Sequence, residues 1–174
     1  AVEFNDFNEV QSSRLNDDDK IVLFLGRITI QKGPDWFIYT AKRVLEMYPN
    51  VKFILAGSGD MEPFIIQKVA EMGIADKVLF AGFLTGTDID RAYSMADLYV
   101  MPSISEPFGI TPLESMRNGT PVLISKQSGV SEVVSHCLKA DFWDIDDMAN
   151  KIIGVLEYSS LHTELKHNGL REVK

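Results

Sequence analysis

Residues 26–33 of the sequence, GRITIQKG, carry two cationic side chains in a short stretch bounded by glycines, a combination that could bind an anion. Arg27 offers a planar fork of donors and Lys32 a point charge, and Pro34 directly afterwards suits the first turn of a helix. Together with the backbone N–H groups of a helix start, these groups suit a diphosphate. Basic loop residues are more often simply solvated, so this stretch alone leaves both interpretations open.

Residues 102–114, PSISEPFGITPLE, form a second stretch, in which a carboxylate is placed among prolines and apolar residues. Glu106 precedes a proline, which favours an extended backbone, and Gly109 would permit a close approach by a ligand. A carboxylate in such surroundings needs hydrogen-bond donors. Sugar hydroxyls are good donors for this purpose.

The end of the second stretch has the pattern of a helix start. Thr111 would be the capping residue, Pro112 the first helical residue and Glu114 the glutamate of a capping box. A capping-box glutamate needs no ligand, so a purely structural role for Glu114 stays open. The backbone N–H groups of Gly109, Ile110 and Thr111 would face the same point in space as the two cations of the first stretch.

Alternating strands and helices would position these two stretches. Apolar runs predict strands at residues 20–25, 51–56, 77–81, 98–101 and 121–124, with a sixth over 138–142. Helical spacing predicts helices over residues 34–48, 61–72, 88–95, 111–117, 130–135, 144–158 and 161–170. We therefore expect an α/β fold, a Rossmann-like doubly wound parallel sheet of about six strands with helices on both faces. Ligands of such sheets bind beyond the carboxyl ends of the strands, where both stretches lie.

Composition limits the partners that we expect for these residues. The 174 residues suffice for one domain, and 45% hydrophobic residues are usual for a globular protein. Seventeen basic and 25 acidic residues give a net charge of −8, which argues against nucleic acid or an anionic membrane as the main partner. No apolar run is as long as a membrane span. The single cysteine, Cys137, excludes a disulfide within the chain and favours the cytoplasm.

Three further motifs have structural explanations that we prefer. Residues 57–59, GSG, begin like a dinucleotide fingerprint but follow the second strand, so a tight turn is expected there. The acidic triplets at residues 88–90 and 144–146 look like metal-binding sequences, yet both fall where helices should begin and where acidic residues are favourable. No histidine or cysteine spacing suggests zinc. We therefore predict no metal site.

A set of motifs occurs in one order along the chain. They are Gly26-Arg27 with Lys32-Gly33, the glutamates Glu106 and Glu114 with seven residues between them, and the sequences PFG at 107–109, NGTPV at 118–122 and SGVSEVV at 128–134. Each motif is weak alone, but the ordered set resembles the retaining glycosyltransferases with the two-domain GT-B fold, the large family that includes sucrose and glycogen synthases. The resemblance runs from Gly26 to about Val134 and is to the C-terminal, donor-binding domain.

The resemblance implies a role for each matching residue. Arg27 and Lys32 would hold the donor diphosphate and stabilise the leaving nucleotide. Glu106 would hold hydroxyls of the donor sugar, and Glu114 would accept hydrogen bonds from the ribose. Arg27, Lys32 and Glu106 would be the catalytic residues. The other expected donor-binding residues are Gly26, Gly109, Ile110 and Thr111 near the diphosphate, and Phe83 and Leu84 near the base.

For a complete protein, the resemblance implies transfer of a hexosyl group with retention, from a donor such as a UDP-, GDP- or ADP-hexose to a glycan or lipid-linked acceptor. No cofactor and no metal ion would be needed, and the pathway would be polysaccharide or glycoconjugate biosynthesis. Residues 1–19 would be the remnant of an interdomain linker, and residues 20–174 the donor-binding domain. The N-terminal acceptor-binding domain would be missing, so the chain alone would be inactive. The complete protein would work in the cytoplasm, attached peripherally to the inner membrane through that domain.

Two other functions stay open on the sequence alone. The chain could be a stand-alone nucleotide-sugar-binding or regulatory module, or part of a GT-B enzyme that is no transferase, such as a nucleotide-sugar epimerase. The paired glutamates favour the transferase family. Product analysis on a full-length protein would distinguish these possibilities.

Overall fold

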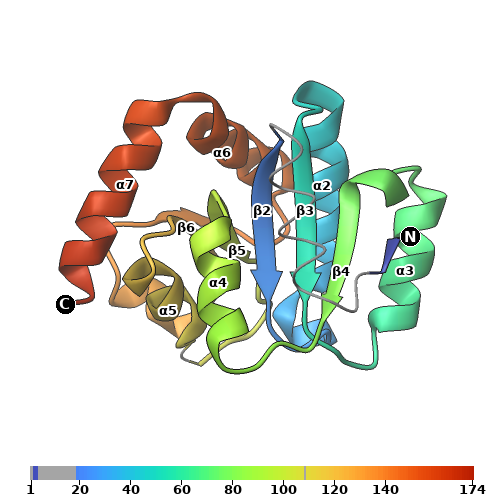
Figure 1. Ribbon diagram of the computed structural model, residues 1–174, viewed down its shortest axis with the longest axis horizontal. Helices are drawn as coiled ribbons and strands as arrows, with labels where there is room; N and C mark the ends of the chain where they lie inside the picture. Colours follow the sequence, from blue (N-terminus) through green and yellow to red (C-terminus); the bar gives the residue numbers. More distant parts are fainter. Residues whose placement is uncertain (1, 4–18, 108) are drawn as a thin grey trace.

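The computed structural model describes residues 2–3, 19–107 and 109–174, which form a parallel β-sheet covered by helices on both faces (Figure 1). The sheet has seven strands in the order β1-β4-β3-β2-β5-β6-β7. The strands are β1 (Val2–Glu3), β2 (Lys20–Leu25), β3 (Val51–Ala56), β4 (Val78–Gly82), β5 (Leu98–Met101), β6 (Val122–Ser125) and β7 (Leu138–Ala140). All neighbouring strands pair in parallel, which confirms the predicted doubly wound α/β fold.

In the described residues, six α-helices cover the sheet. They are α2 (Pro34–Met47), α3 (Glu62–Glu71), α4 (Thr87–Met95), α5 (Thr111–Arg117), α6 (Ile145–Glu157) and α7 (Ser159–Glu172). Apolar residues of α2, α3 and α6 form one buried cluster against the sheet, and residues of α4 and α5 form a second cluster on the opposite face. Strand β2 contributes residues to both clusters. Val22 and Phe24 belong to the first cluster, and Ile21 and Leu23 belong to the second. Helix α7 packs at the side of the sheet against α5 and α6 (Figure 1).

The sheet contains one strand that the sequence did not predict. Val2–Glu3 pairs with β4 through Leu79 and Phe80, although residues 1–19 were expected to be a linker. A two-residue strand carries no periodic signal, so its pairing was not visible in the sequence. The rest of the expected linker, residues 4–18, lies outside the described residues.

One predicted helix differs in kind from the one observed. The helix expected over residues 130–135 is a short 3-10 helix, Gly129–Glu132, that ends before Val133. The backbone N–H groups of Val133 and Val134 both reach back to the Val130 carbonyl at 3.1 Å, which completes a single turn and no more. The strand expected over residues 138–142 ends at Ala140.

The strand order reverses between β2 and β5. From β2 the chain adds β3 and β4 on one side, and then crosses to β5, β6 and β7 on the other. The helices that follow β2 and β5 pack on opposite faces of the sheet, so the carboxyl ends of these two strands border the kind of crevice in which open α/β sheets bind ligands. Both chemically promising stretches of the sequence follow these two strands.

Candidate functional site

The loop after β2 contacts the loop after β5. The 3-10 helix Ile30–Lys32 ends at Gly33, whose φ of 70° is in the left-handed region. A Cβ atom at Gly33 would lie 2.0 Å from the Pro102 carbonyl oxygen, so only glycine fits this contact. The Ile104 N–H also donates to the Gln31 carbonyl at 2.9 Å. These contacts hold Lys32 beside the second stretch.

Lys32 and Glu106, which lie in different stretches of the sequence, form an ion pair between Lys32 Nζ and Glu106 Oε2. The Glu106 side chain is 12% exposed and that of Lys32 is 32% exposed, so the pair is largely shielded from solvent. The backbone of Glu106 is fixed as well, because its carbonyl accepts from the Gly129 N–H at 2.7 Å. A Cβ atom at Gly129 would lie 1.7 Å from the Pro107 carbonyl oxygen, so a glycine is required at 129.

Arg27 borders a hollow of about 410 Å³ beside the carboxyl ends of β2, β3 and β4. Its side chain is exposed, and Phe83 on the far loop is 74% exposed. The structure therefore brings Arg27, Phe83 and Leu84 around one space. The residues that line it are Leu25, Gly26, Arg27, Ala56, Gly57, Ser58, Gly59, Phe83 and Leu84.

The GSG sequence at residues 57–59 lies against the loop after β2. A Cβ atom at Gly57 would lie 1.8 Å from the Gly26 carbonyl oxygen, and one at Gly59 would lie 2.3 Å from the Ile28 carbonyl oxygen. The Ile28 N–H donates to the Ser58 carbonyl at 2.9 Å. The two loops touch through their backbones, so these glycines shape one side of the hollow.

The structure corrects the prediction that Thr111 caps α5. Ile110 is the N-cap, its φ of −84° and ψ of −23° are helical, and no side chain caps the helix. The Thr111 hydroxyl lies 2.9 Å from the Tyr99 hydroxyl, so it is engaged by the strand. Glu114 is not a capping-box residue either, because its Oε2 accepts from the Tyr93 hydroxyl at 3.3 Å. The capping-box explanation for Glu114 therefore fails, and its carboxylate has Tyr93 as a structural partner instead.

Gly109 and Ile110 occupy different environments at the start of α5. A Cβ atom at Gly109 would lie 3.1 Å from Met101 Sδ and 3.4 Å from Pro112 Cδ, so this glycine allows tight packing inside the protein. Ile110, by contrast, is exposed within the second stretch.

Tyr93 and Tyr99 are site residues that the sequence did not reveal. Their rings pack edge to face with centroids 5.5 Å apart, and each side chain is nearly fully buried. Burial raises the pKa of both phenols well above the usual value, so both hydroxyls stay protonated donors. Tyr99 lies in an apolar strand and Tyr93 on a helix that carries several polar residues, and a buried tyrosine hydroxyl needs a partner. The need of a buried tyrosine hydroxyl for a hydrogen-bond partner was the signal in the sequence that could have revealed these two residues.

A small cavity of about 30 Å³ lies between the carboxyl ends of β2 and β5. Gly26 borders both this cavity and the larger hollow, and a Cβ atom there would meet nothing within 4 Å. Ser103, which the sequence did not single out, lines the cavity and is fully buried. The lining residues are Phe24, Leu25, Gly26, Lys32, Tyr99, Met101, Ser103 and Thr111.

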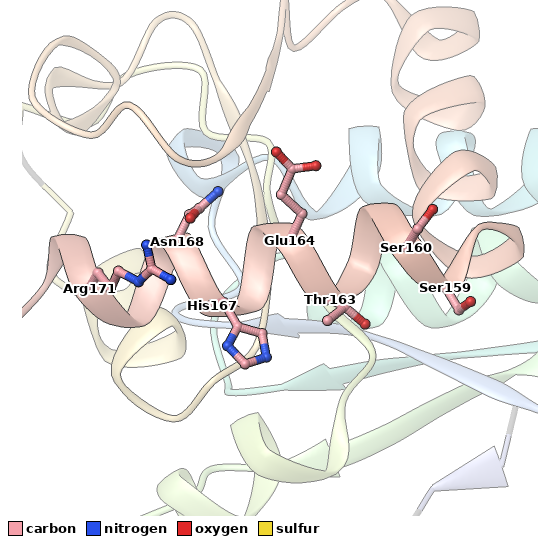
Figure 2. A pocket seen from close by; sticks show the side chains of 7 residues that line it. All are labelled: Ser159, Ser160, Thr163, Glu164, His167, Asn168 and Arg171. Atoms are coloured by element: carbon pink, nitrogen blue, oxygen red, sulfur yellow. The ribbon is translucent and has the colours of Figure 1, made fainter.

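A further hollow, of about 500 Å³, lies along α7, away from the predicted site residues. Figure 2 shows its seven lining side chains, all of which come from this one helix. Within the described residues no second element contributes to the lining, so the groups do not converge on a ligand. Across residues 2–3, 19–107 and 109–174, no cluster of three or more histidine, cysteine or acidic side chains could hold a metal ion. None of the described helices is long and apolar enough to cross a membrane.

Several solved structures share this fold. The C-terminal domain of a group 1 glycosyl transferase (LpcC) of Francisella tularensis superposes with a TM-score of 0.83 at 23% identity, and the match covers 99% of this chain and 93% of that one. HepE of Anabaena in complex with UDP-glucose gives a TM-score of 0.85 at 23% identity, covering 96% and 47%. Sucrose-phosphate synthase of Thermosynechococcus elongatus gives 0.83 at 29% identity, covering 92% and 42%.

Curated relatives share more sequence. An uncharacterized glycosyltransferase of Methanocaldococcus jannaschii is 41% identical over 126 residues, which are 72% of this chain and 32% of the relative. Mannosylfructose-phosphate synthase of Agrobacterium fabrum is 31% identical over 172 residues, which are 92% of this chain and 38% of the relative. The chain thus spans about a third of the length of the curated relatives that it matches. The family described as glycosyl transferases group 1 matches residues 5–172, and the chain belongs to this family.

Proposed function

We propose that the chain binds the nucleoside-diphosphate sugar of a retaining glycosyltransferase, and that the whole protein transfers the hexosyl group to a glycan or another acceptor. The observation that carries this proposal is the ion pair of Lys32 and Glu106 beside the crevice between β2 and β5. A cation suited to a diphosphate and a carboxylate suited to sugar hydroxyls meet where such a sheet binds its ligand. The UDP-glucose complex of HepE supports the same class of donor.

The ion pair gives the ligand-free protein a way to keep both charges satisfied. When a donor binds, its diphosphate oxygens take the place of Glu106 at Lys32, and its sugar hydroxyls take the place of Lys32 at Glu106. Neither of these half-buried charges is then left unpaired, which would otherwise be costly. A donor that supplies both groups together is favoured over either group alone.

Transfer would proceed by departure of the nucleoside diphosphate from the anomeric carbon. Arg27 and Lys32 would neutralise the negative charge that grows on the leaving diphosphate, and this stabilisation acts most strongly in the transition state. The two cations supply the charge that other transferases obtain from a metal ion, so we propose that neither a metal nor a cofactor is needed. Glu106 would orient the sugar ring through its hydroxyls.

The nucleoside would lie toward the larger hollow. Glu114, whose carboxylate is oriented by the Tyr93 hydroxyl, would accept from the ribose hydroxyls. Phe83 and Leu84 border the hollow of about 410 Å³ in which the base would sit. Uracil, guanine and adenine all stay candidates for this space.

The acceptor and the pathway belong to the whole protein. We propose a glycan or lipid-linked acceptor, bound by polypeptide beyond the present residues, and a role in polysaccharide or glycoconjugate biosynthesis. The name of the mannosylfructose-phosphate synthase that matches 92% of the chain supports transfer to a sugar-like acceptor. The one cysteine, which is free, supports the cytoplasm as the compartment.

Titration of UDP, GDP, ADP and their hexose derivatives against residues 1–174 tests the proposal, with and without a chelator. We expect one nucleoside diphosphate to bind, with the chelator leaving its affinity unchanged. Lys32→Gln should weaken it about tenfold or more, since a charge-assisted hydrogen bond is lost. Lys42→Gln on α2 is the matched control and should bind like the parent. The proposal fails if no such ligand binds the parent, or if Lys32→Gln binds as tightly as the control.

A further inference from the structure

Ser103 carries a hydroxyl that the folded chain buries without using it. The residue is fully buried, and its Oγ has no hydrogen-bond partner among the described residues. Most buried hydroxyls in proteins are paired, because an unpaired one destabilises the fold. An alanine would fill almost the same space without this cost. The serine therefore needs an explanation beyond packing.

The surrounding backbone holds Ser103 in place. Its carbonyl accepts from the Ser125 hydroxyl at 2.7 Å. The preceding Pro102 carbonyl touches Gly33, and the following Ile104 N–H donates to Gln31. The backbone of Ser103 is thus held at one place by two loops and by strand β6.

Ser103 lines the cavity of about 30 Å³ at the reversal of strand order. Two other hydroxyls line it, but that of Tyr99 already lies 2.9 Å from Thr111 Oγ1 and 3.1 Å from the Leu25 carbonyl. Lys32 lines the cavity from the other loop. A space of this size accepts one oxygen-sized group. A hydroxyl donor beside an ammonium group suits an anionic oxygen.

We propose that Ser103 is a donor-binding residue, whose hydroxyl donates a hydrogen bond to an oxygen of the diphosphate that Lys32 binds. This inference rests on the proposed function, since it names a further contact of the same site. The unpaired hydroxyl is then a property of the ligand-free protein, and it is satisfied in the complex. The cost to the stability of the free chain and the gain in affinity come from the same atom.

Ser103→Ala in residues 1–174 separates this role from a structural one. The probes are whichever of UDP, GDP or ADP binds the parent, together with the matching nucleoside. We expect the affinity for the diphosphate to fall about tenfold, since a hydrogen bond to a charged group is lost. The affinity for the nucleoside should not change, and the ligand-free melting temperature should be equal or higher. Ser103→Cys, which keeps a weaker donor of similar size, should lie between alanine and the parent.

Thr40→Val provides the matched control. Thr40 Oγ1 on α2 is also buried without a partner among the described residues, but it does not line the cavity. Its removal should leave the melting temperature equal or higher, and should leave the affinity for both probes unchanged. The two variants therefore remove similar atoms and differ in only one expected effect.

Three results would overturn the inference. If Ser103→Ala binds the diphosphate like the parent while Lys32→Gln does not, the proposed function stands and the role of Ser103 is wrong. If Ser103→Ala lowers the ligand-free melting temperature and weakens the diphosphate and the nucleoside equally, the hydroxyl supports the fold. If the parent binds no nucleoside diphosphate, the proposed function and this inference fail together.

Discussion

At the scale of single residues, the two glutamates of the site have different partners and therefore different expected tasks. Glu106 pairs with Lys32, a cation that would also attract the diphosphate. Glu114 accepts from the neutral hydroxyl of Tyr93, which orients the carboxylate without neutralising it. Removing the negative charge from each should thus affect different parts of the donor.

Glu106→Gln should reduce only the affinity that the sugar adds. The plain nucleoside diphosphate should bind as well as before or better, because Lys32 loses its competing partner. The affinity for the sugar-bearing donor should fall about tenfold, which corresponds to the loss of one charge-assisted hydrogen bond.

Glu114→Gln should instead lower the affinity for both ligands by a similar factor, because both ligands carry the ribose. Calorimetric titration of both ligands resolves these patterns, with the exposed Glu157→Gln on α6 as control. Parental affinity for both ligands in both variants would show that the site is wrongly assigned.

Cys137 illustrates a residue whose burial determines its chemistry. Its Sγ lies 3.7 Å from the Val134 carbonyl oxygen, and burial raises the pKa of the thiol from 9.0 to about 11. A thiol reacts as the thiolate, so the native protein should react with iodoacetamide far more slowly than the unfolded chain at pH 8. The rate should rise only as the pH approaches 11. Equal rates in the native and unfolded protein would contradict the burial of this side chain.

The same shift has a consequence for stability. The pKa of the folded state is raised above that of the unfolded state, so the contribution of the neutral thiol is fully present below pH 9 and is lost as the pH rises through about 11. Cys137→Ala should flatten this part of the alkaline unfolding curve. Denaturant titrations at several pH values between 8 and 11 measure the difference.

At the scale of elements, the apolar runs specified the six main strands, and the glycines and prolines specified where most helices begin. These signals are local, and burial on both faces makes each strand a continuous apolar run. The first strand was missed because two residues have no period. The prediction that Thr111 caps α5 is wrong because its hydroxyl accepts a hydrogen bond from the Tyr99 hydroxyl, twelve residues away on another element.

The site shows the same division between local and distant information. Lys32 and Glu106 were predicted from their own loops, but their contact joins residues separated by 74 positions. Ser103 and Tyr99 lie in or beside an apolar strand, and nothing in their neighbours reveals a polar task. Only the pairing of β2 with β5 brings their hydroxyls to a cavity. Sequence motifs therefore named the charged half of the site and not its buried hydroxyls.

Gly33 and Gly73 form a natural pair for testing how the loops are joined. Both have a positive φ, 70° and 72°, but only a Cβ atom at Gly33 would meet another loop, at 2.0 Å from the Pro102 carbonyl oxygen. Gly73→Ala should cost about 1 kcal/mol through left-handed backbone strain alone. Gly33→Ala should cost about 2 kcal/mol more, as in an overpacked site. Urea unfolding measures both, and equal losses would show that the contact with Pro102 is unimportant.

The variants Gly33→Ala and Gly73→Ala should also differ in their affinity for the donor. Gly33→Ala should also weaken a nucleoside diphosphate, because Lys32 precedes it and moves with the loop. Gly73→Ala should leave the affinity unchanged, since Gly73 follows α3 and is remote from the ion pair.

At the scale of the whole molecule, exposed apolar side chains occur at the edge that carries the site. Ile30, Phe83, Ile110 and Val133 are exposed, and they lie beyond the carboxyl ends of β2, β4, β5 and β6. Exposed apolar residues near one site are typical of a surface that another protein surface covers. A second domain closing over this edge would bury them and exclude water from the reaction.

We expect the donor and the acceptor to be bound by different parts of the whole protein. All the residues proposed to bind the donor lie within residues 26–114, whereas the chain spans only about a third of the relatives' length. Residues 1–174 should therefore bind the nucleoside-diphosphate sugar but transfer no hexose to any acceptor, because the acceptor is proposed to bind outside this chain and positioning contributes a large part of such rates. Detection of released nucleoside diphosphate and of glycosylated product measures transfer, and a longer form that resembles the relatives in length is the control. Product formed by residues 1–174 at a rate similar to that of the longer form would mean that acceptor binding also lies within this chain.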